Sequence, residues 1–289
     1  MRHLGFLCAA ATAGVALARD ASYLVMMSPR SGGSSEVRTY DPFDGRLVHS
    51  SYINLRSLPP TISSNPWDMR SVGSELWVTD PGTQRINRFS QNGAYLGGFS
   101  MSGPRGMEVV GDIVYVAATN RVYQYDFAGH FQGSFATAVS SNSDVTLYNG
   151  ELLVSANTGD GTFQSIFRYD LGGNLLGTFS PVSVPTFQVE PEADGNILVA
   201  GTWEFDSAGV ELNYWARSET GAGGRGVFRL GNGNLMVTDS TGRRIFDPDD
   251  GTHVFVEGGS AMMVSLVTVP APSAAAVILL ASAIARRRR

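Results

Sequence analysis

The chain has 289 residues, 43% of them hydrophobic and 10% aromatic, which is enough for the core of one or two domains. Its 34 glycines exceed what a helical protein needs and favour a fold with many tight turns. Cys8 is the single cysteine and lies near the N-terminus. The rest of the chain therefore has neither disulfides nor a cysteine-based metal or catalytic site.

The N-terminus has the pattern of an export signal. A short basic start, Met1-Arg2-His3, precedes an apolar and small-residue run from Leu4 to Ala18. Ala16-Leu17-Ala18 fits the small-x-small rule for cleavage, so we predict a signal peptide over residues 1–18. The alternative is that this segment forms a buried first helix.

The region after this segment is a series of repeats. An aromatic residue, often followed by Asp and, a few residues later, by Gly, recurs at intervals of 49, 36, 44, 36 and 41 residues. Asp begins a turn by bonding to backbone amides, Gly supplies a positive φ, and the aromatic ring fills the space between sheets. This period predicts a repeat of about four strands. The six aromatic residues are Tyr40, Phe89, Tyr125, Tyr169, Phe205 and Phe246.

The clearest copy of the repeat runs from Gly103 to Phe135. Its turn residues separate four predicted strands, at residues 104–110, 112–118, 121–126 and 130–135. The second strand of each copy is nearly continuous in apolar residues, which is typical of strands covered on both faces. We predict these second strands at residues 75–80, 112–117, 151–156, 196–200 and 234–239.

The two ends of the repeat region predict how it closes. Ser22–Met27 looks like a second strand with no first strand before it, and Ser260–Val267 is a spare strand after the last full copy. If the spare strand completes the first copy, no sheet is left without its neighbour. We therefore predict an all-β fold, a six-bladed β-propeller of four-stranded blades over residues 19–268, closed by a C-terminal strand that joins the N-terminal blade. Helical segments are expected only at the two termini.

The repeats resemble those of NHL and streptogramin-lyase-like propellers over about residues 22–267. Pro104-Arg105-Gly106-Met107, Ile113–Ala117 and Asn120-Arg121-Val122 carry this resemblance best. Gly226-Val227 and Arg244-Ile245 repeat parts of it, whereas the fifth copy, from Trp203 to Trp215, is degenerate. The resemblance implies the propeller fold.

The rim of the predicted channel is the best candidate for a ligand site, because loops that enter the first strands face the channel in propellers. Aligning the copies gives one column of Trp67, Arg105, Ser143, Thr186, Arg225 and Ser260, and a second of Asp68, Gly106, Asp144, Phe187, Gly226 and Ala261. We expect Gly106 and Gly226 to be structural. A sugar or peptide would then be bound by Trp67, Asp68, Arg105, Asp144, Phe187 and Arg225.

Compact catalytic and metal motifs are few. Gly221–Gly226 matches GxGxxG but does not follow a strand, so we interpret it as a loop. His49, His130 and His253 fall at the outer edges of different blades, where they cannot share a metal. Asp247–Gly251 has oxygen ligands for calcium, but the same position is a turn in every copy. We therefore predict no catalytic residues, metal ligands or cofactors.

The C-terminus resembles the PEP-CTERM sorting signal of exported bacterial proteins. Val269-Pro270-Ala271-Pro272 precedes an apolar segment, Ser273–Ala285, and then four arginines, Arg286–Arg289. Ala271 replaces the Glu of the usual motif. The resemblance implies that an exosortase-type enzyme processes residues 269–289 and delivers the protein to the cell surface or the extracellular matrix. The alternative is a plain membrane anchor, although 13 helical residues span only ~20 Å of a ~30 Å bilayer core.

Loss of both ends would make the protein strongly acidic. It would remove five of the 21 basic residues and none of the 26 acidic ones, leaving a net charge of −10. Such a surface repels nucleic acids and anionic lipids and tolerates divalent cations and neutral or cationic ligands. We expect no nucleic-acid partner.

Two functions remain open. The first is a non-catalytic surface or matrix module that binds an extracellular polysaccharide or protein. The second is a propeller enzyme of the lyase or lactonase type, which would need clustered carboxylates or histidines at the channel mouth.

Overall fold

The computed structural model describes residues 21–28, 36–59, 62–63, 65–138, 140–157, 164–179, 187–200, 203–215, 224–258 and 260–269. The predicted signal peptide, Pro270, Ala271, Pro272 and the apolar tail lie outside these residues. The chain divides into one compact unit, Ser22–Thr268, and a second made of the two chain ends, Met1–Ala21 and Val269–Arg289. The unit Ser22–Thr268 contains the six repeats.

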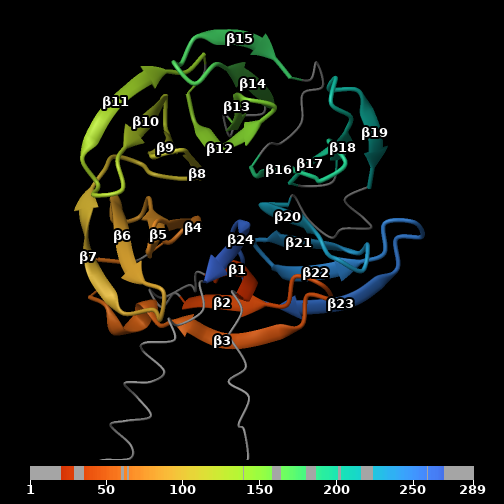
Figure 1. Cartoon of the computed structure of the whole chain (residues 1–289). Coiled ribbons are helices and arrows are strands. Elements are labelled where there is room, and N and C mark those ends of the chain that lie inside the picture. The colour runs from red at the N-terminus through yellow and green to blue at the C-terminus, as the bar shows by residue number, and fades with distance from the viewer. Residues whose placement is uncertain are drawn as a thin grey trace, which may run out of the picture. The chain divides into compact units, whose positions relative to one another are not determined.

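This unit is a six-bladed β-propeller, as the repeats predict (Figure 1). Each blade is a four-stranded sheet, and the paired strands with assigned register are antiparallel. From the channel outward, blade 1 contains β24 (Val264–Val269), β1 (Ala21–Ser28), β2 (Glu36–Tyr40) and β3 (Leu47–Ile53). Blade 2 contains β4 (Met69–Val72), β5 (Glu75–Asp80), β6 (Arg85–Ser90) and β7 (Tyr95–Ser100). Blade 3 contains β8 (Met107–Val110), β9 (Ile113–Ala118), β10 (Arg121–Tyr125) and β11 (Phe131–Ala136). Blade 4 contains β12 (Asn142–Tyr148), β13 (Glu151–Asn157), β14 (Gln164–Tyr169) and β15 (Leu175–Thr178). Blade 5 contains β16 (Val189–Pro191), β17 (Ile197–Val199), β18 (Trp203–Phe205) and β19 (Glu211–Tyr214). Blade 6 contains β20 (Gly226–Arg229), β21 (Leu235–Asp239), β22 (Gly242–Phe246) and β23 (His253–Gly258).

The predicted closure is confirmed. Strand β24, from the C-terminal end of the propeller, is the innermost strand of blade 1 and pairs with β1. The strand occupies Val264–Val269, slightly later than the predicted range of residues 260–267. The described residues contain a single short 3-10 helix, η1 (Leu55–Ser57), and no α-helix. Among them no helix is long and apolar enough to span a membrane.

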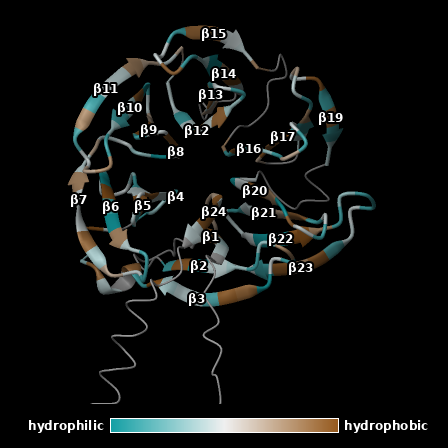
Figure 2. Ribbon diagram, in the orientation of Figure 1, coloured by the Kyte–Doolittle hydropathy of each residue, from teal (hydrophilic) through white to brown (hydrophobic). Residues whose placement is uncertain are grey.

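The aromatic residues of the repeat form the core between blades. All six are buried, and brown apolar positions alternate with teal polar ones along the strands (Figure 2). Between blades 2 and 3, for example, the ring of Phe99 lies 5.4 Å from Trp77 and 5.0 Å from Tyr125. Each such ring removes ~150–250 Å² from water, so the six rings supply much of the stability of the ring of blades.

The turn after each aromatic residue also forms as predicted. In blade 3 the Asp126 carboxylate accepts the N–H groups of Ala128 and His130, at 2.9 and 2.8 Å, and Gly129 has a φ of 88°. In all six blades the pairing of the third and fourth strands shifts register just before the aromatic residue. Such β-bulges bend and twist the outer strand.

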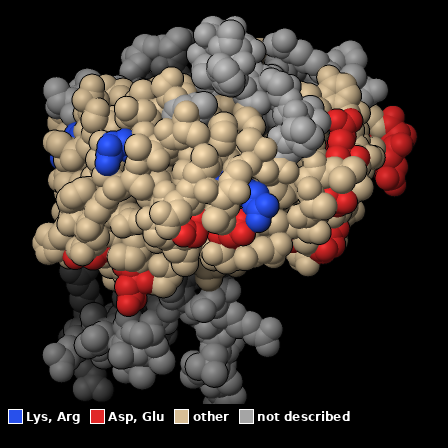
Figure 3. Space-filling model, turned by 90° about the horizontal axis from the view of Figure 1, so that it is seen from above, with Lys and Arg blue, Asp and Glu red and all other residues tan. Residues whose placement is uncertain are grey.

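The outer strands carry apolar residues and few charges. Seen from above, uncharged side chains cover most of the described part of the visible face (Figure 3). Leu175 and Leu176 of β15 and Phe131 of β11 are exposed. Because unprotected edge strands pair readily with other chains, the bulge beside each one disfavours edge-to-edge association.

Candidate functional site: the central channel

Six first strands, β24, β4, β8, β12, β16 and β20, surround the channel (Figure 1). Each is the innermost strand of its sheet, so one of its two edges has no strand partner. The N–H groups on this free edge point toward the channel and need other acceptors. At one level of the channel these inward N–H groups belong to Met69, Met107, Val145, Val189, Val227 and Val264.

Three side chains accept all six of these N–H groups. Asp68 accepts those of Met69 and Met107 at 2.8 and 2.9 Å. Asp144 accepts those of Val145 and Val189 at 2.9 and 3.0 Å. We call Asp68, Asp144 and Gln188 the axial triad.

Gln188 completes the pattern from blade 5. Its Oε1 accepts the N–H groups of Val227 and Val264 at 3.2 and 3.0 Å, so it connects blades 6 and 1. Asp68 connects blades 2 and 3, and Asp144 connects blades 4 and 5. The three residues are at most 1% exposed. Each buried N–H left without an acceptor would cost ~1–3 kcal/mol, so the triad holds the inner strands of the ring together.

Two glycines make room for the triad. A Cβ on Gly106 would lie 2.7 Å from the Cα of Asp144 and would also overlap its Oδ1. A Cβ on Gly226 would lie 2.7 Å from the N atom of Val264 and 3.0 Å from Oε1 of Gln188. Both glycines therefore have the structural role that the sequence predicts.

The alignment of the copies needs correction in two blades. Val189 pairs with Val199 as Met69 pairs with Val78, so Gln188, and not Phe187, occupies the column of Asp68 and Asp144. Phe187 belongs in the column of Trp67. In blade 1, Val264 offers the equivalent inward N–H, so Met262 and Met263 replace Ser260 and Ala261. The residues that precede the first strands of blades 1 and 5 differ from those of the other blades. Their alignment with the other copies is therefore fixed by strand pairing and not by residue type.

Three of the six predicted site residues meet at one end of the channel. Trp67 of blade 2 and Phe187 of blade 5 come from opposite sides of the ring, and their ring centroids are 6.0 Å apart. The Arg105 guanidinium lies 5.3 Å from the centroid of Trp67 and donates to Oγ of Ser141 and the carbonyl of Asn142 at 3.1 and 2.8 Å. We call Trp67, Arg105 and Phe187 the aromatic mouth. It presents partly exposed aromatic faces beside a cation.

The other three predicted site residues are Asp68, Asp144 and Arg225. Asp68 and Asp144 are deeper in the channel, where both bind backbone N–H groups and are buried. Arg225 is partly exposed and donates to Oγ of Ser260 at 3.3 Å. Thr186, a member of the first column, lies outside the described residues. The ligand role predicted for Asp68, Asp144 and Arg225 remains a prediction.

Two polar atoms of this region have no partner among the described residues. Nε1 of Trp67 and Oγ of Ser143 are buried there without a hydrogen bond. An unpaired buried polar atom costs free energy, and such atoms occur where a ligand or water completes the contact.

Further charged side chains lie in the channel two residues after Asp68, Gly106 and Gln188. They are Arg70, Glu108 and Glu190, on β4, β8 and β16. Strand alternation predicts that positions two residues apart share a face, so this rule applied to Asp68, Gly106 and Gln188 could have found them. Arg70 donates to Asp68 and to the carbonyl of Met107 at 3.2 and 2.9 Å.

These charges change the acidity of the channel carboxyls. Burial, and then the negative charge of Asp68, raise the pKa of Asp144 well above its usual range, against the opposing effect of Arg70. Burial also raises the pKa of Glu190 to about 7. Burial lowers the pKa of Arg70, but the surrounding carboxylates, Asp68 first, outweigh it, so the pKa of Arg70 is raised. The channel therefore contains more acid than Arg70 neutralises.

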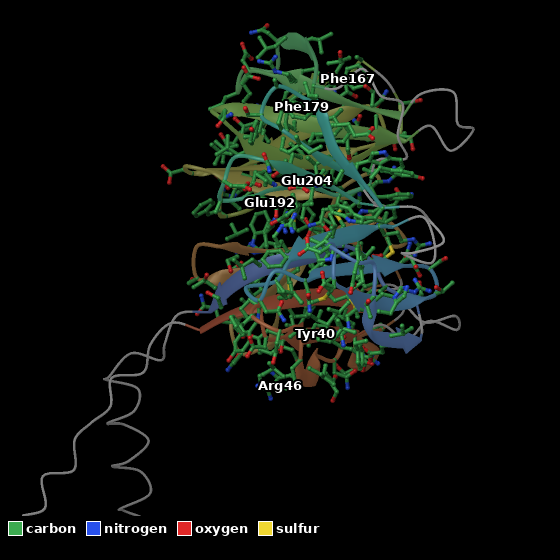
Figure 4. The ribbon with its side chains drawn as sticks, turned by 90° about the vertical axis from the view of Figure 1, so that its right-hand side faces the viewer. Tyr40, Arg46, Phe167, Phe179, Glu192 and Glu204 are labelled. Atoms are coloured by element: carbon green, nitrogen blue, oxygen red, sulfur yellow. The ribbon has the colours of Figure 1, made fainter. Side chains whose placement is uncertain are left out.

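One group of three acids among the described residues lies close enough together to hold a metal ion. The ligand atoms of Glu192, Asp194 and Glu204 lie within 4.8 Å of one another, and Glu192 and Glu204 are adjacent on blade 5 (Figure 4). Arg229 forms ion pairs with Glu192 and Glu204, at 2.5 and 3.2 Å. The arginine takes the place that a cation would have, so this group is an ion-pair cluster.

The three histidines and the turn at Asp247–Gly251 lie as predicted, whereas residues 221–223 of the GxGxxG match lie outside the described residues. His49 and His253 are in the outer strands β3 and β23, and His130 directly precedes β11. Asp247–Gly251 forms a turn in which Asp247 accepts the N–H of Asp249 at 2.9 Å.

Known proteins share the fold with this chain. No protein-family model and no curated protein sequence matches it. A protein of unknown function from Bacteroides caccae is similar, with a TM-score of 0.60 and 10% identity over 86% of this chain and 99% of that one. A chain in a nidogen/laminin complex has a TM-score of 0.65 and 11% identity, over 87% and 100% of the two chains.

A third similar structure is an extracellular domain assigned to a hybrid two-component system of Bacteroides thetaiotaomicron. The TM-score is 0.53 with 12% identity, and the match covers 85% of this chain and 33% of that one. Identities this low establish the propeller fold alone.

Proposed function

We propose that the propeller is an exported binding module that recognises an extracellular carbohydrate or peptide at the aromatic mouth. The observation that carries this proposal is the meeting of Trp67 and Phe187, from opposite blades, beside the Arg105 guanidinium. Aromatic faces pack against sugar rings and peptide side chains, and a neighbouring guanidinium donates to hydroxyl, carbonyl or carboxylate oxygens.

The positions of the two ends of the propeller support exposure of the aromatic mouth to ligands. Trp67 precedes the first strand of its blade, whereas Thr268 lies near the end of another first strand, β24. Since first strands run from the mouth to the opposite end of the channel, Thr268 lies at that opposite end. Oγ of Ser22 is 3.3 Å from Oγ1 of Thr268, so both ends of the propeller leave from the same face. Both points where the chain leaves the propeller are therefore at the end opposite the aromatic mouth.

The predicted export and sorting signals give the proposed location. The signal peptide would bring the chain across the membrane, and an exosortase-type enzyme would process the tail near Val269-Pro270-Ala271-Pro272. The similarity to structures described as an extracellular domain and as part of a nidogen/laminin complex supports an extracellular role.

Ligand arrays test the binding role. We expect the purified protein to bind one class of glycan or peptide, and Trp67→Ala and Phe187→Ala each to weaken the affinity at least tenfold. Phe131→Ala, on an exposed outer strand, is the matched control and should bind normally. Equal binding by the Trp67→Ala variant and the control would contradict the proposal.

A separate experiment tests the sorting role. The tagged protein is expressed in a host with and without its exosortase, and its mass is measured. Loss of mass near Pro270 in the host with the enzyme alone supports processing. Identical masses in both hosts would leave the plain membrane anchor.

A further inference from the structure

A recess lies at the end of the channel opposite the aromatic mouth. It has a volume of about 360 Å³ and is formed by the ends of first strands in blades 5, 6 and 1, chiefly by Glu190, Glu192, Phe228, Arg229 and Leu266. This volume is at the lower end of those that bind small molecules. We call it the turn-side recess, since the turns between first and second strands surround it.

One acid of the recess is already neutralised. Arg229 forms an ion pair with Glu192 at 2.5 Å and a second with Glu204 at 3.2 Å. Burial raises the pKa of Glu192, and Arg229 opposes this shift. Arg229 therefore forms its two ion pairs with Glu192 and Glu204 and not with Glu190.

Glu190 has no such partner among the described residues. It receives one side-chain hydrogen bond within that part of the chain, from Nε2 of Gln188 at 3.1 Å, and it forms no ion pair there within 4 Å. Arg70 is the cation that most affects it, but Arg70 pairs with Asp68. A carboxylate in a recess without a cation of its own is a favourable site for a cation from solution.

The rest of the lining is apolar. Phe228 contributes an aromatic ring, and Leu266 is 47% exposed although it lies on an innermost strand. An aromatic ring attracts cations at its face, and this attraction grows when the cation is shielded from water. A bare metal ion would need more carboxylate oxygens close to Glu190, and the described acids do not supply them.

We propose that the turn-side recess binds a small organic cation, an amine or guanidine, with the Glu190 carboxylate as its counter-ion and Phe228 and Leu266 packed against its carbon atoms. This site shares no residue with the aromatic mouth, so the two binding proposals are tested independently. The ligand is defined by its charge and by its apolar stem.

Binding to this recess should depend on pH. Gln188 donates to Glu190, and the charged groups around it are Glu192 on its own blade, Arg70 and Asp68 on blade 2, Glu108 on blade 3 and Arg229 on blade 6. Burial raises the pKa of Glu190 to about 7, so the carboxyl is largely protonated at pH 5.5 and ionised at pH 8. A cation binds the ionised form, so its affinity should rise with pH over this range.

The probe is agmatine, which has a guanidinium, a primary amine and a four-carbon stem, titrated calorimetrically into the full chain. We expect binding at pH 8 that is at least tenfold weaker at pH 5.5, and no binding of uncharged 1,4-butanediol. Glu190→Gln should lose at least tenfold in affinity at pH 8, and Phe228→Leu a smaller factor. Glu211→Gln, on the exposed outer strand β19, is the control and should bind as the wild type does.

The melting temperature of each variant shows that it has folded. Glu190→Gln keeps an acceptor for Gln188 and removes a poorly compensated charge, so it should melt no lower than the wild type. If wild type fails to bind agmatine at pH 8, or if the folded Glu190→Gln variant binds it equally well, the proposal is wrong.

Discussion

Blades 3 and 5 have the same four-stranded topology but give the channel different side chains. At three equivalent channel positions, blade 3 contributes Arg105, Gly106 and Glu108, whereas blade 5 contributes Phe187, Gln188 and Glu190. Gly106 leaves space that Asp144 of blade 4 fills. Gln188 instead crosses to the N–H groups of two other blades.

This comparison separates what the blades share from what distinguishes them. The aromatic residue of the repeat, the turn and the outer bulge are alike in both, because each blade must pack against its neighbours. The three inward positions differ, because the six first strands share one channel and cannot all carry large side chains there. Specific recognition is therefore expected at positions where blades depart from their common pattern.

The largest predicted effect tests the part that the blades share. Phe205→Ala in blade 5 and Tyr125→Ala in blade 3 should each lower the free energy of unfolding by ~3–5 kcal/mol, because both rings are buried between blades. Chemical denaturation measures this loss, with Leu175→Ala on an exposed outer strand as the control. If Phe205→Ala cost no more than the control, blade 5 would not be packed like blade 3.

A somewhat smaller effect tests the space at Gly106. Gly106→Ala places a Cβ against Asp144, so we expect a loss of about 1–3 kcal/mol in the free energy of unfolding. Gly258→Ala is the matched control, since a Cβ there meets no atom within 4 Å. Equal stability of the two variants would mean that Asp144 is not held where the structure places it.

The sequence could predict the repeated part because its signals are local. The aromatic residue, the Asp and the Gly of each turn lie within a few residues of one another, and the missing first strand of blade 1 has its complement at Ser260–Val267. The axial triad could not be predicted in this way. It depends on which N–H groups face one another across the channel, and the divergent blade 5 shifted the alignment by one residue at Phe187. Glu108 and Glu190 could have been predicted from strand alternation, because each lies two residues after an aligned channel position.

An effect of similar size, on the pH dependence of stability, distinguishes blade 5 at Glu190. Its pKa in the folded protein is about 7, above the value of 4.5 expected in the unfolded chain. The folded state therefore holds the proton more tightly, so this residue's contribution to stability is complete below pH 4.5 and is lost as the pH rises through 7.

Glu190→Gln should remove this dependence. Relative to the wild type, the variant should gain about 1–3 kcal/mol in the free energy of unfolding between about pH 4.5 and pH 8. Denaturant midpoints across this range measure the difference, with Glu211→Gln as the control. A wild-type profile parallel to that of Glu190→Gln would show that the Glu190 carboxyl is not buried as described.

Three side chains, Asp68, Asp144 and Gln188, accept one inward N–H group from each of the six first strands. Amide hydrogen exchange of the wild type and Gln188→Ala tests this central claim most directly. In the wild type, the amides of Met69, Met107, Val145, Val189, Val227 and Val264 should be protected although no strand pairs with them. In Gln188→Ala, exchange at Val227 and Val264 should accelerate by at least tenfold, while exchange at Met69 and Met107 should change much less, since Asp68 remains. Rapid exchange of Val227 and Val264 in the wild type, or unchanged protection in the variant, would contradict the claim.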